Sequence, residues 1–328
     1  MTQPPLAGRR RLGLVGDIGG TNARFGLVDL DAPQVEVLGP AEGPCADHPR
    51  ALDAIRSYLE AQGVAEAPLA AVVAVAGPVE AGAIRFTNSP WALSEADLRG
   101  LGVGTARLVN DYAAQALAAP LLGGKDLHVL GPAIPAPDPG GTILVLGPGT
   151  GFGVSGLARD GAVEVALSTE GGHVGFAPGD EVEIELLRRL TRRHGRVSVE
   201  RILSGPGLVE LHAVLQAIDG RTTDLDDPAA ISAAARKGDA ACAATLERFC
   251  AILGSVAGDF ALAYGARGGL LIAGGIAPRI LDLIGRSAFR ARFEGKGRFT
   301  AYLRAIPTAV IVRRNAALLG AARALRAL

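Results

Sequence analysis

Residues 14–28 read Leu14-Val-Gly-Asp-Ile-Gly-Gly-Thr-Asn-Ala-Arg-Phe-Gly-Leu-Val28. An apolar run leads into Asp17, two glycines and a threonine, and a second apolar run follows. This order predicts a strand, a tight turn and an antiparallel return strand. Gly19 and Gly20 can adopt backbone conformations that other residues avoid, so that consecutive amides can face one anion. The carboxylate of Asp17, beside the turn, suits a magnesium ion held directly or through its waters. The stretch therefore predicts a phosphate-binding hairpin.

The composition is that of a soluble globular protein with a substantial core. The chain has 328 residues, of which 49% are hydrophobic and 20% charged, and this length predicts two lobes. Lys plus Arg and Asp plus Glu both count 33, so no net charge favours nucleic acid or an anionic membrane as a partner. No apolar segment approaches the length of a membrane span. The apolar stretch after Arg9-Arg10-Arg11 is interrupted by Asp17 too early for a signal sequence.

The three cysteines form neither a metal-ligand spacing nor a disulfide framework. They are Cys45, Cys242 and Cys250. Cys242 and Cys250 lie in an apolar, helical stretch, where a free cysteine usually packs in the core rather than binding a ligand. This usage fits a reducing compartment, and the expected location is the cytoplasm.

Continuous apolar runs alternate with amphipathic stretches, which predicts an α/β protein. The runs are typical of strands buried on both faces, and they span residues 69–76, 143–146, 269–273 and 309–312. The amphipathic stretches 48–62 and 314–328 predict helices. Ser94 to Asp97 predicts a capping box that opens a short helix. Residues 131–141, rich in Pro and Gly, predict a loop or linker.

The two halves of the chain share a weak internal repeat. Residues 14–21 and 144–151 both run from an apolar strand into a glycine turn, and each continues toward a Gly-Leu pair. Each half also ends a buried strand in Ala-Gly, at residues 75–78 and 272–275. Two similar lobes, each presenting a glycine turn to a shared cleft, explain this pattern. The alternative is chance similarity among small residues, because the chain contains 45 glycines.

Two common nucleotide-binding motifs are missing from the sequence. No G-x-x-x-x-G-K-[ST] segment is present, so there is no P-loop lysine. The glycines of residues 147–153 do not fit the G-x-G-x-x-G register, and no acidic residue follows where a ribose partner is expected, which disfavours a dinucleotide-binding dehydrogenase. Residues 148–151 instead predict a second phosphate-binding hairpin. The alternative is a plain glycine turn.

Asn110 and Asp111 follow a short strand and open an Ala-rich helix. In the functional interpretation Asp111 is a general base that accepts a proton from a substrate hydroxyl during phosphoryl transfer, with Asn110 as a hydrogen-bonding neighbour. In the structural alternative Asp111 is the N-cap of the helix, a position that favours Asp.

A second polar group surrounds the glycine pair of residues 171–172. Glu170 and His173 lie on either side of this pair, so their side chains can converge on one polyhydroxylated ligand. One His and one Glu do not make a metal site. Glu200 adds another acid near a predicted helix start, although by itself it is a weak signal. The alternative for His173 is a structural or surface role.

Taken together, these motifs resemble the bacterial glucokinases of the sugar kinase, actin and chaperone ATPase superfamily. They follow one another in the family's order over nearly the whole chain, which makes the resemblance specific. The matching segments are 16–24 (GDIGGTNAR), 86–91 (FTNSPW), 110–111 (ND), 149–151 (GTG), 170–173 (EGGH), 200–207 (ERILSGPG) and 273–279 (AGGIAPR).

The resemblance implies a two-lobed, actin-like α/β fold of the ribonuclease H-like type, with a cleft between a smaller N-terminal and a larger C-terminal lobe. The expected small lobe is residues 1–121, completed by a C-terminal helix at 315–328. The expected large lobe is residues 122–314. The resemblance also implies a homodimer.

The resemblance further implies ATP-dependent phosphorylation of D-glucose to glucose 6-phosphate, with Mg²⁺ bound near Asp17 through water. Asp111 is then the catalytic base and also contacts the sugar. Asn88 is a further candidate at the edge of the sugar. The other implied sugar ligands are Asn110, Glu170, His173 and Glu200. The implied nucleotide contacts are Gly16, Asp17, Gly19, Gly20, Thr21, Asn22, Arg24, Gly149, Thr150, Gly151, Gly274 and Gly275.

The sequence departs from that of the related repressor–kinases. Those proteins often carry a Cys-rich zinc site after the Glu-Gly-Gly-His motif, whereas residues 176–180 contain no Cys, and the residues before Leu12 leave no room for a helix-turn-helix. The zinc-free glucokinases are therefore expected. Two alternatives stay open: a kinase for another hexose, such as mannose, fructose or an N-acetylated amino sugar, and a non-catalytic, actin-like ATP-binding protein.

Overall fold

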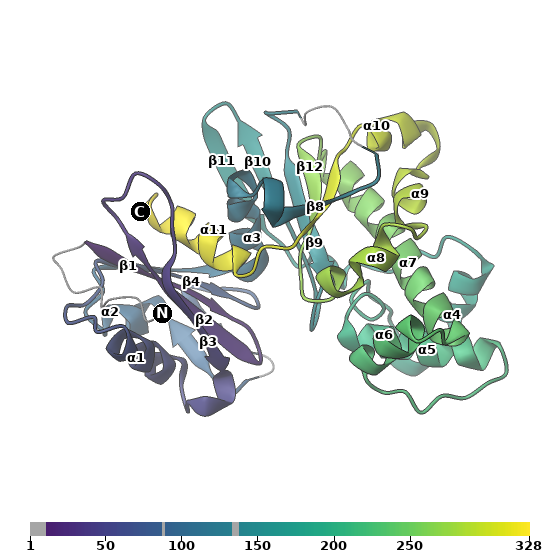
Figure 1. Cartoon of the computed structure of the whole chain (residues 1–328), viewed down its shortest axis with the longest axis horizontal. Coiled ribbons are helices and arrows are strands. Elements are labelled where there is room, and N and C mark those ends of the chain that lie inside the picture. Colours follow the sequence, from purple (N-terminus) through teal and green to yellow (C-terminus); the bar gives the residue numbers. More distant parts are fainter. Residues whose placement is uncertain (1–10, 87–88, 133–137) are drawn as a thin grey trace. The chain divides into compact units, whose positions relative to one another are not determined.

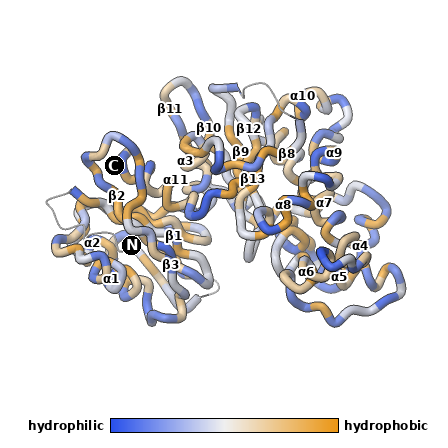
Figure 2. Tube along the Cα trace, in the orientation of Figure 1, coloured by the Kyte–Doolittle hydropathy of each residue, from blue (hydrophilic) through white to orange (hydrophobic). Residues whose placement is uncertain are grey.

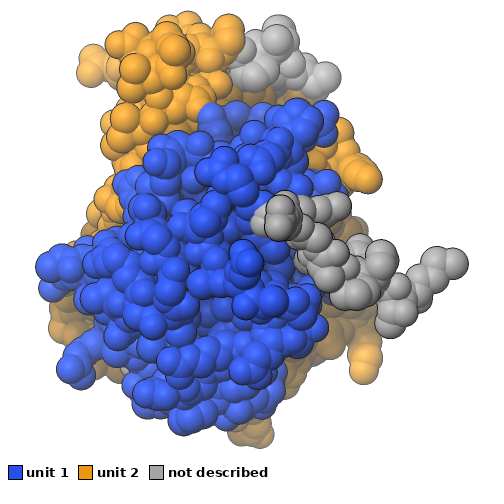
Figure 3. All heavy atoms as spheres, turned by 90° about the vertical axis from the view of Figure 1, so that its left-hand side faces the viewer, with its two compact units in different colours: residues 1–122, 313–328 blue, residues 123–312 orange. Residues whose placement is uncertain are grey.

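The computed structural model describes residues 11–86, 89–132 and 138–328 of the chain. The chain divides into two compact units, which Figure 3 colours separately. Unit 1 comprises residues 1–122 and 313–328, and unit 2 comprises residues 123–312. The C-terminal segment therefore folds with the N-terminal part of the chain.

Unit 1 is built on a five-stranded sheet in the order β3-β2-β1-β4-β7, with a separate two-stranded sheet, β5-β6 (Figure 1). β1 pairs antiparallel with β2 and parallel with β4, and β4 pairs parallel with β7. The strands are β1 (Leu12–Ile18), β2 (Asn22–Asp29), β3 (Leu38–Pro44), β4 (Ala70–Val75), β5 (Ala83–Arg85), β6 (Ala92–Ser94) and β7 (Thr105–Asn110). The α-helices are α1 (Ala51–Ala61), α2 (Glu95–Arg99), α3 (Asp111–Ala118) and α11 (Ala316–Leu325).

Helices cover both faces of this sheet, which explains the continuous apolar run of β4. Successive side chains of a strand point to opposite faces. Val73 belongs to the core cluster that includes Ile55 of α1, whereas Val72 belongs to the cluster that includes Leu318 of α11. Every residue of β4 is consequently buried. The predicted strand and both predicted helices are confirmed, as is the capping box at Ser94.

A glycine allows α11 to approach α3 closely. A Cβ on Gly320 would overlap the carbonyl oxygen of Ala114 on α3. Replacing Gly by Ala inside an exposed helix usually stabilises it by about 1 kcal/mol. At Gly320 we expect the opposite, because the two helix backbones must move apart to admit a methyl group.

Gly320→Ala is therefore expected to lower the free energy of unfolding by about 1–3 kcal/mol, the usual cost of overpacking. Urea or thermal unfolding measures this change. Gly43→Ala on β3 is the matched control, because a Cβ at Gly43 meets no atom within 4 Å. Equal stabilities of the two variants would show that α3 and α11 tolerate the wider spacing.

Unit 2 is built on a six-stranded sheet in the order β11-β10-β9-β12-β13-β8. Its central strands are buried and stand out among the hydrophobic segments in Figure 2. The strands are β8 (Leu127–Leu130), β9 (Ile143–Pro148), β10 (Phe152–Asp160), β11 (Val163–Ser168), β12 (Gly269–Ile272) and β13 (Thr308–Ile311). The α-helices are α4 (Glu181–His194), α5 (Gly205–Ile218), α6 (Pro228–Arg236), α7 (Ala240–Tyr264), α8 (Leu281–Ile284), α9 (Phe289–Glu294) and α10 (Thr300–Arg304). Part of the predicted linker, residues 133–137, lies outside the described residues.

The two large sheets share one topology. In each sheet three consecutive strands form an antiparallel meander, β1-β2-β3 and β9-β10-β11. The first strand of each meander pairs parallel with a fourth strand, which pairs parallel with a fifth. The unit 2 sheet also has β8, which pairs antiparallel with β13. The strands β1, β2, β3, β4 and β7 of unit 1 thus correspond to β9, β10, β11, β12 and β13 of unit 2. Gly77 after β4 and Gly274 after β12 occupy corresponding positions, and both have positive φ. The predicted similarity of the two halves is confirmed at the level of sheet topology.

Helix α7 (Ala240–Tyr264) corrects the expectation that no apolar segment approaches the length of a membrane span. Its 25 residues contain a window with a mean hydropathy of 1.4, so by length and composition it is long and apolar enough to cross a membrane. Within unit 2, 61% of that window is buried. Phe249, Ile252 and Leu253 belong to the core cluster of this unit. α7 is apolar because it is the central helix of a core, around which other helices pack.

All three cysteines are buried, which confirms the core positions predicted for Cys242 and Cys250. Their exposed fractions are 5% for Cys45, 1% for Cys242 and 0% for Cys250. Burial raises the pKa of Cys242 to about 11 and that of Cys250 to about 12, and it also raises the pKa of Cys45. Because the thiolate is the reactive form, folded protein at neutral pH presents little of it.

We therefore expect a disulfide reagent such as Ellman's reagent to leave the three thiols unmodified in the folded protein at neutral pH. After unfolding in guanidinium chloride, the same reagent should titrate all three. The measurement is the absorbance of the released thiolate. Fast reaction of a thiol before unfolding would contradict the burial of that cysteine.

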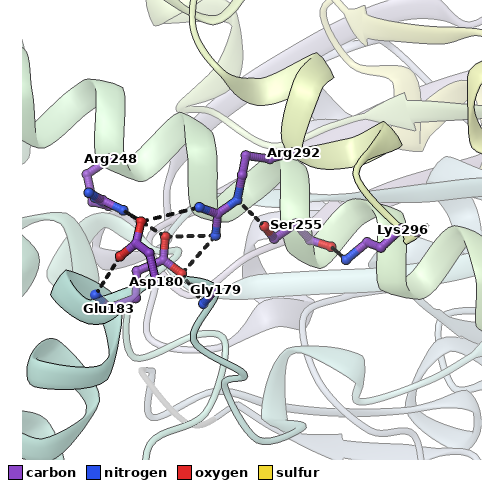
Figure 4. Close-up of polar contacts among 7 residues, drawn as sticks. All are labelled: Gly179, Asp180, Glu183, Arg248, Ser255, Arg292 and Lys296. Carbon is purple, nitrogen blue, oxygen red and sulfur yellow. Dashed lines mark hydrogen bonds and ion pairs between the residues drawn. The ribbon is translucent and has the colours of Figure 1, made fainter. Parts of the chain in front are cut away.

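A buried ion-pair network joins three helices of unit 2 (Figure 4). Glu183 of α4 is fully buried and accepts hydrogen bonds from Arg248 of α7, at 3.0 Å, and Arg292 of α9, at 2.9 Å. Arg248 also pairs with Asp180, the N-cap residue of α4. Arg292 donates in addition to Ser255 Oγ at 2.7 Å. Through these ion pairs, Arg248 connects α7, and Arg292 connects α9, to the start of α4.

Candidate active site

The first predicted hairpin is present in unit 1. Ile18 and Ala23 form the last pair between β1 and β2, and the N–H of Gly19 donates to the carbonyl of Asn22 at 3.0 Å. Gly20 and Thr21 form the tip of the turn. The structure therefore brings Gly19, Gly20, Thr21 and Asn22 together at one edge of the sheet.

Gly16 lies inside β1 and is buried, away from the tip of the turn. A Cβ there would lie 3.0 Å from Val73 Cγ1 and 3.2 Å from Phe25 Cδ1. The packing of the sheet is therefore a reason for a glycine at this position that does not depend on a ligand.

Asp17 and Arg24 form an ion pair beside the turn. Arg24 Nη1 donates to Asp17 Oδ2 at 3.1 Å, and Arg24 Nη2 donates to Glu42 Oε1 at 2.7 Å. Burial raises the pKa of Asp17, and the neighbouring Arg24 opposes this shift by stabilising the charged form. The sequence predicted Arg24 as a nucleotide contact without indicating that two carboxylates hold its guanidinium.

Strand register brings the end of β7 to the same sheet edge as this turn. Ile18 is paired with Val75, and Val75 with Asn110, across the parallel strands β1, β4 and β7. Neighbouring strands lie about 4.8 Å apart, so Ile18 and Asn110 are separated by about 10 Å. Asp111 follows at once as the first residue of α3. The carboxyl edge of the unit 1 sheet therefore carries both the first hairpin and Asp111.

Asn110, rather than Asp111, caps helix α3. Its Oδ1 accepts hydrogen bonds from the N–H groups of Tyr112, at 3.0 Å, and Ala113, at 3.1 Å. The Asp111 carboxylate accepts from the N–H of Tyr112 at 2.9 Å. The structural alternative for Asp111, a helix N-cap, is therefore wrong, because β7 continues to Asn110 and the helix starts one residue later.

The second predicted hairpin is present in unit 2. Pro148 pairs with Phe152 between β9 and β10, and the N–H of Gly149 donates to the carbonyl of Gly151 at 2.8 Å. Thr150 is exposed at the tip, as Thr21 is in the first hairpin. The corresponding strands of the other sheet end in the same kind of hairpin, as the predicted internal repeat requires.

The turn after β12 lies beside the second hairpin. The N–H of Ile276 donates to the carbonyl of Pro148 at 3.3 Å, and a Cβ on Gly149 would lie 4.0 Å from the N atom of Gly275. Gly274 has a φ of +84°. This value lies in the left-handed region, which glycine adopts readily because it has no side chain. Gly149, Gly274 and Gly275 thus occupy one sheet edge.

Of the predicted sugar ligands, Glu200 contacts the second hairpin, and Glu170 and His173 flank the neighbouring 3-10 turn. Glu200 Oε2 accepts from the N–H of Phe152 at 2.8 Å, and Glu200 Oε1 lies 4.0 Å from His173 Nε2. Glu170 directly precedes the 3-10 turn Gly171–His173, and the N–H of His173 donates to its carbonyl at 3.0 Å. Glu170 and His173 are exposed, and Glu200 is half-buried. The structure therefore brings these three residues to one region of unit 2.

The glycine pair between Glu170 and His173 is needed for packing. A Cβ on Gly172 would overlap the carbonyl oxygen of Phe152, and a Cβ on Gly171 would lie 2.7 Å from Val154 Cβ. The absence of both side chains lets this turn press against β10, next to the second hairpin. This contact holds His173 close to Glu200.

Two further contacts hold the hairpins, and the motifs gave no sign of them. Cys45, which seemed unpatterned in the sequence, donates its N–H to the carbonyl of Thr21 at 2.8 Å. The N–H of Gly205, at the start of α5, donates to the carbonyl of Gly149 at 2.9 Å. Ser204 caps that helix by accepting from the N–H of Gly207 at 3.0 Å. Both tethers join residues that are distant in sequence.

Asn88 lies outside the described residues, so its position is not part of the site described above. Across the described ranges, no group of three or more His, Cys, Asp or Glu side chains is arranged to hold a metal ion.

The fold and these residues define a sugar kinase of the two-lobed, actin-like type. The family model described as Glucokinase matches residues 14–328. A glucokinase of Caulobacter sp. (strain K31) is 56% identical over 315 residues, which cover 96% of this chain and 95% of that protein. The chain belongs to the glucokinase family.

Solved structures agree with this assignment. The crystal structure of a glucokinase from an Antarctic psychrotroph superposes with a TM-score of 0.87 at 38% identity, covering 97% of this chain and 99% of the other. A Streptomyces griseus glucokinase of the ROK family, solved with glucose and AMPPNP, is similar in fold alone, with a TM-score of 0.61 at 19% identity. That alignment covers 97% of this chain and 100% of the other.

Proposed function

We infer that this chain is a glucokinase that transfers the γ-phosphoryl group of ATP to the 6-hydroxyl of D-glucose. The observation that carries the inference is the position of Asp111 at the carboxyl edge of a sheet whose first hairpin has the form of a phosphate-binding turn. Membership of the glucokinase family along residues 14–328 supports the choice of substrates.

In this proposal Asp111 orients the 6-hydroxyl and accepts its proton as the oxygen attacks phosphorus. Asp111 lies in the first turn of α3, and the Asn110 cap stabilises this end of the helix. The cap engages the oxygen of the Asn110 amide, so the nitrogen is the group that we propose donates to a sugar hydroxyl.

Glucose recognition is proposed for the acids and the histidine of unit 2. Glu170, His173 and Glu200 each have a polar group that can bind a hydroxyl. Hydrogen bonds to a defined set of hydroxyls reject analogues that lack one of them, because a polar group of the site then stays unpaired. The proximity of Glu200 to His173 supports a shared ligand.

The ATP phosphates are proposed to lie against the amides of the two hairpins, and the adenosine against the turn after β12. Backbone N–H groups that face developing negative charge stabilise it without reorganising. The proposed contacts are Gly16, Asp17, Gly19, Gly20, Thr21, Asn22, Arg24, Gly149, Thr150, Gly151, Gly274 and Gly275.

Magnesium fits the neighbourhood of Asp17. Mg²⁺ prefers oxygen ligands and keeps several of its waters, and Asp17 offers one carboxylate. Arg24 already binds Oδ2 of this carboxylate, so contact through a water is favoured over direct ligation. When bound with ATP, the ion supplies positive charge to the phosphates.

A coupled assay of ADP release over a panel of hexoses tests the proposal. We expect glucose to give the highest kcat/KM. A higher value for mannose, fructose or an N-acetylated amino sugar would favour the second candidate, a kinase for another hexose. If no sugar stimulates ADP release, the chain is a non-catalytic, actin-like ATP-binding protein.

We also propose a homodimer, on the family resemblance alone, and a cytoplasmic location, on the unpatterned cysteines. Light scattering behind a size-exclusion column measures the mass in solution. A mass near 33.4 kDa, that of one chain, would refute the dimer. We propose no nucleic-acid or membrane partner.

A further inference from the structure

One carboxylate of unit 2 contacts both proposed substrate regions. Glu200 Oε2 accepts a hydrogen bond of 2.8 Å from the N–H of Phe152, the residue that ends the turn of the second hairpin. Its other oxygen, Oε1, lies 4.0 Å from His173 Nε2. Glu200 thus reaches the nucleotide hairpin with one oxygen and the sugar-binding group with the other.

The backbone near Glu200 also contacts both regions, through two hydrogen bonds. The N–H of Glu200 donates to the carbonyl of Gly172 at 2.9 Å, and the N–H of Gly205, five residues on, donates to the carbonyl of Gly149 at 2.9 Å. The segment from Glu200 to Gly205 therefore binds the Gly171–His173 turn at one end and the second hairpin at the other.

The close approach of the carboxylate depends on a glycine in the hairpin. A Cβ on Gly151 would overlap Glu200 Oε2. Gly151 has no positive φ, so its backbone conformation is open to other residues. The space taken by the Glu200 carboxylate is the reason that the structure shows for a glycine at this position.

We propose that Glu200 is a positioning residue for the second phosphate hairpin and thereby couples nucleotide binding to sugar binding. A sugar hydroxyl that donates to Oε1 restrains the carboxylate, and Oε2 then holds the Phe152 amide, and with it the hairpin, in place. Such coupling is reciprocal: if glucose tightens nucleotide binding, nucleotide tightens glucose binding by the same factor. The inference rests on the proposed function and names a second role for one of its residues.

The experiment is isothermal titration of AMPPNP with Mg²⁺ into the full chain, with and without glucose. For the wild-type chain we expect glucose to tighten AMPPNP binding. For Glu200→Ala we expect AMPPNP affinity without glucose to fall by about tenfold, the size expected for one hydrogen bond to a charged group. We also expect the effect of glucose on AMPPNP binding to disappear in that variant.

Two further variants separate positioning from sugar binding. Glu170→Ala is the matched control: it removes a proposed sugar ligand that, in the described contacts, makes none with the second hairpin, so its AMPPNP affinity without glucose should equal the wild type. Glu200→Gln keeps an oxygen that can accept from the Phe152 N–H. It should retain most of the AMPPNP affinity that Glu200→Ala loses, while its KM for glucose rises.

The outcomes distinguish this inference from the proposed function. If the wild-type chain binds AMPPNP but Glu200→Ala binds it equally well without glucose, Glu200 is a sugar ligand only and the inference is wrong. Equal losses in Glu200→Gln and Glu200→Ala would also overturn it, because the hydrogen bond would then be irrelevant. If the wild-type chain neither binds AMPPNP nor phosphorylates any hexose, the proposed function itself fails.

Discussion

Asp111→Asn is expected to lower kcat for glucose by about 10²- to 10⁴-fold, the usual contribution of a general base. The amide has the shape of the carboxylate but cannot accept the proton of the 6-hydroxyl. The substitution also preserves the start of α3, because Asn110 provides the cap and the oxygen of the introduced amide can still accept from the N–H of Tyr112. Steady-state kinetics of ADP release measures the loss.

Two controls make the Asp111 result specific. The thermal midpoint of Asp111→Asn should match the wild type, and AMPPNP affinity should be unchanged, because the proposed phosphate contacts are intact. A kcat within a few-fold of the wild type would exclude Asp111 as the base. A large loss with an equally large loss of AMPPNP affinity would instead indicate a damaged nucleotide site.

Glu183→Ala is expected to lower the free energy of unfolding by about 3–5 kcal/mol, as is usual when one partner of a buried ion pair is removed. Glu183 is fully buried, and both of its arginine partners are about three-quarters buried. Its loss leaves Arg248 and Arg292 with fewer acceptors and removes the partner of the Gly179 N–H, which donates to Glu183 Oε2 at 2.7 Å. Urea denaturation followed by circular dichroism measures the change.

Glu185→Ala is the matched control on the same helix. Glu185 pairs with Arg188 and Arg189 at the surface of α4, where solvent screens the charges, so little change in stability is expected. If the two variants were equally stable, the network in Figure 4 would contribute no more than a surface ion pair.

Buried elements of the fold were the easiest to predict from the sequence. The strands β4, β9, β12 and β13 are apolar along their length, because helices or neighbouring layers cover both faces. β3 was missed, since its seven residues include two prolines and two glycines. Such a composition is tolerated at the edge of a sheet, where one side of the backbone needs no partner.

For α2 and α3, the sequence predicted where the helix begins to within a residue, but it identified the capping residue only for α2. The capping box at Ser94 is local and was found, since both of its partners lie within four residues. At the start of α3, both Asn110 and Asp111 are favourable caps, and sequence alone could not choose. Asn110 pairs with Val75 as the last residue of β7, and its side chain caps the helix, so that α3 starts at Asp111.

By itself, the sequence determined the two glycine hairpins, the buried strands and the polar residues that match the glucokinase motifs. These features depend on neighbours within a few residues, through backbone freedom at glycine and the alternation of side chains. Only the tertiary structure decided which of these side chains form hydrogen bonds or ion pairs with other residues of the chain. The contacts of Arg24 with Glu42 and of Glu200 with the Phe152 amide join residues 18 and 48 positions apart. The physical reason is that strand pairing and packing bring such residues together, and no local pattern encodes that distance.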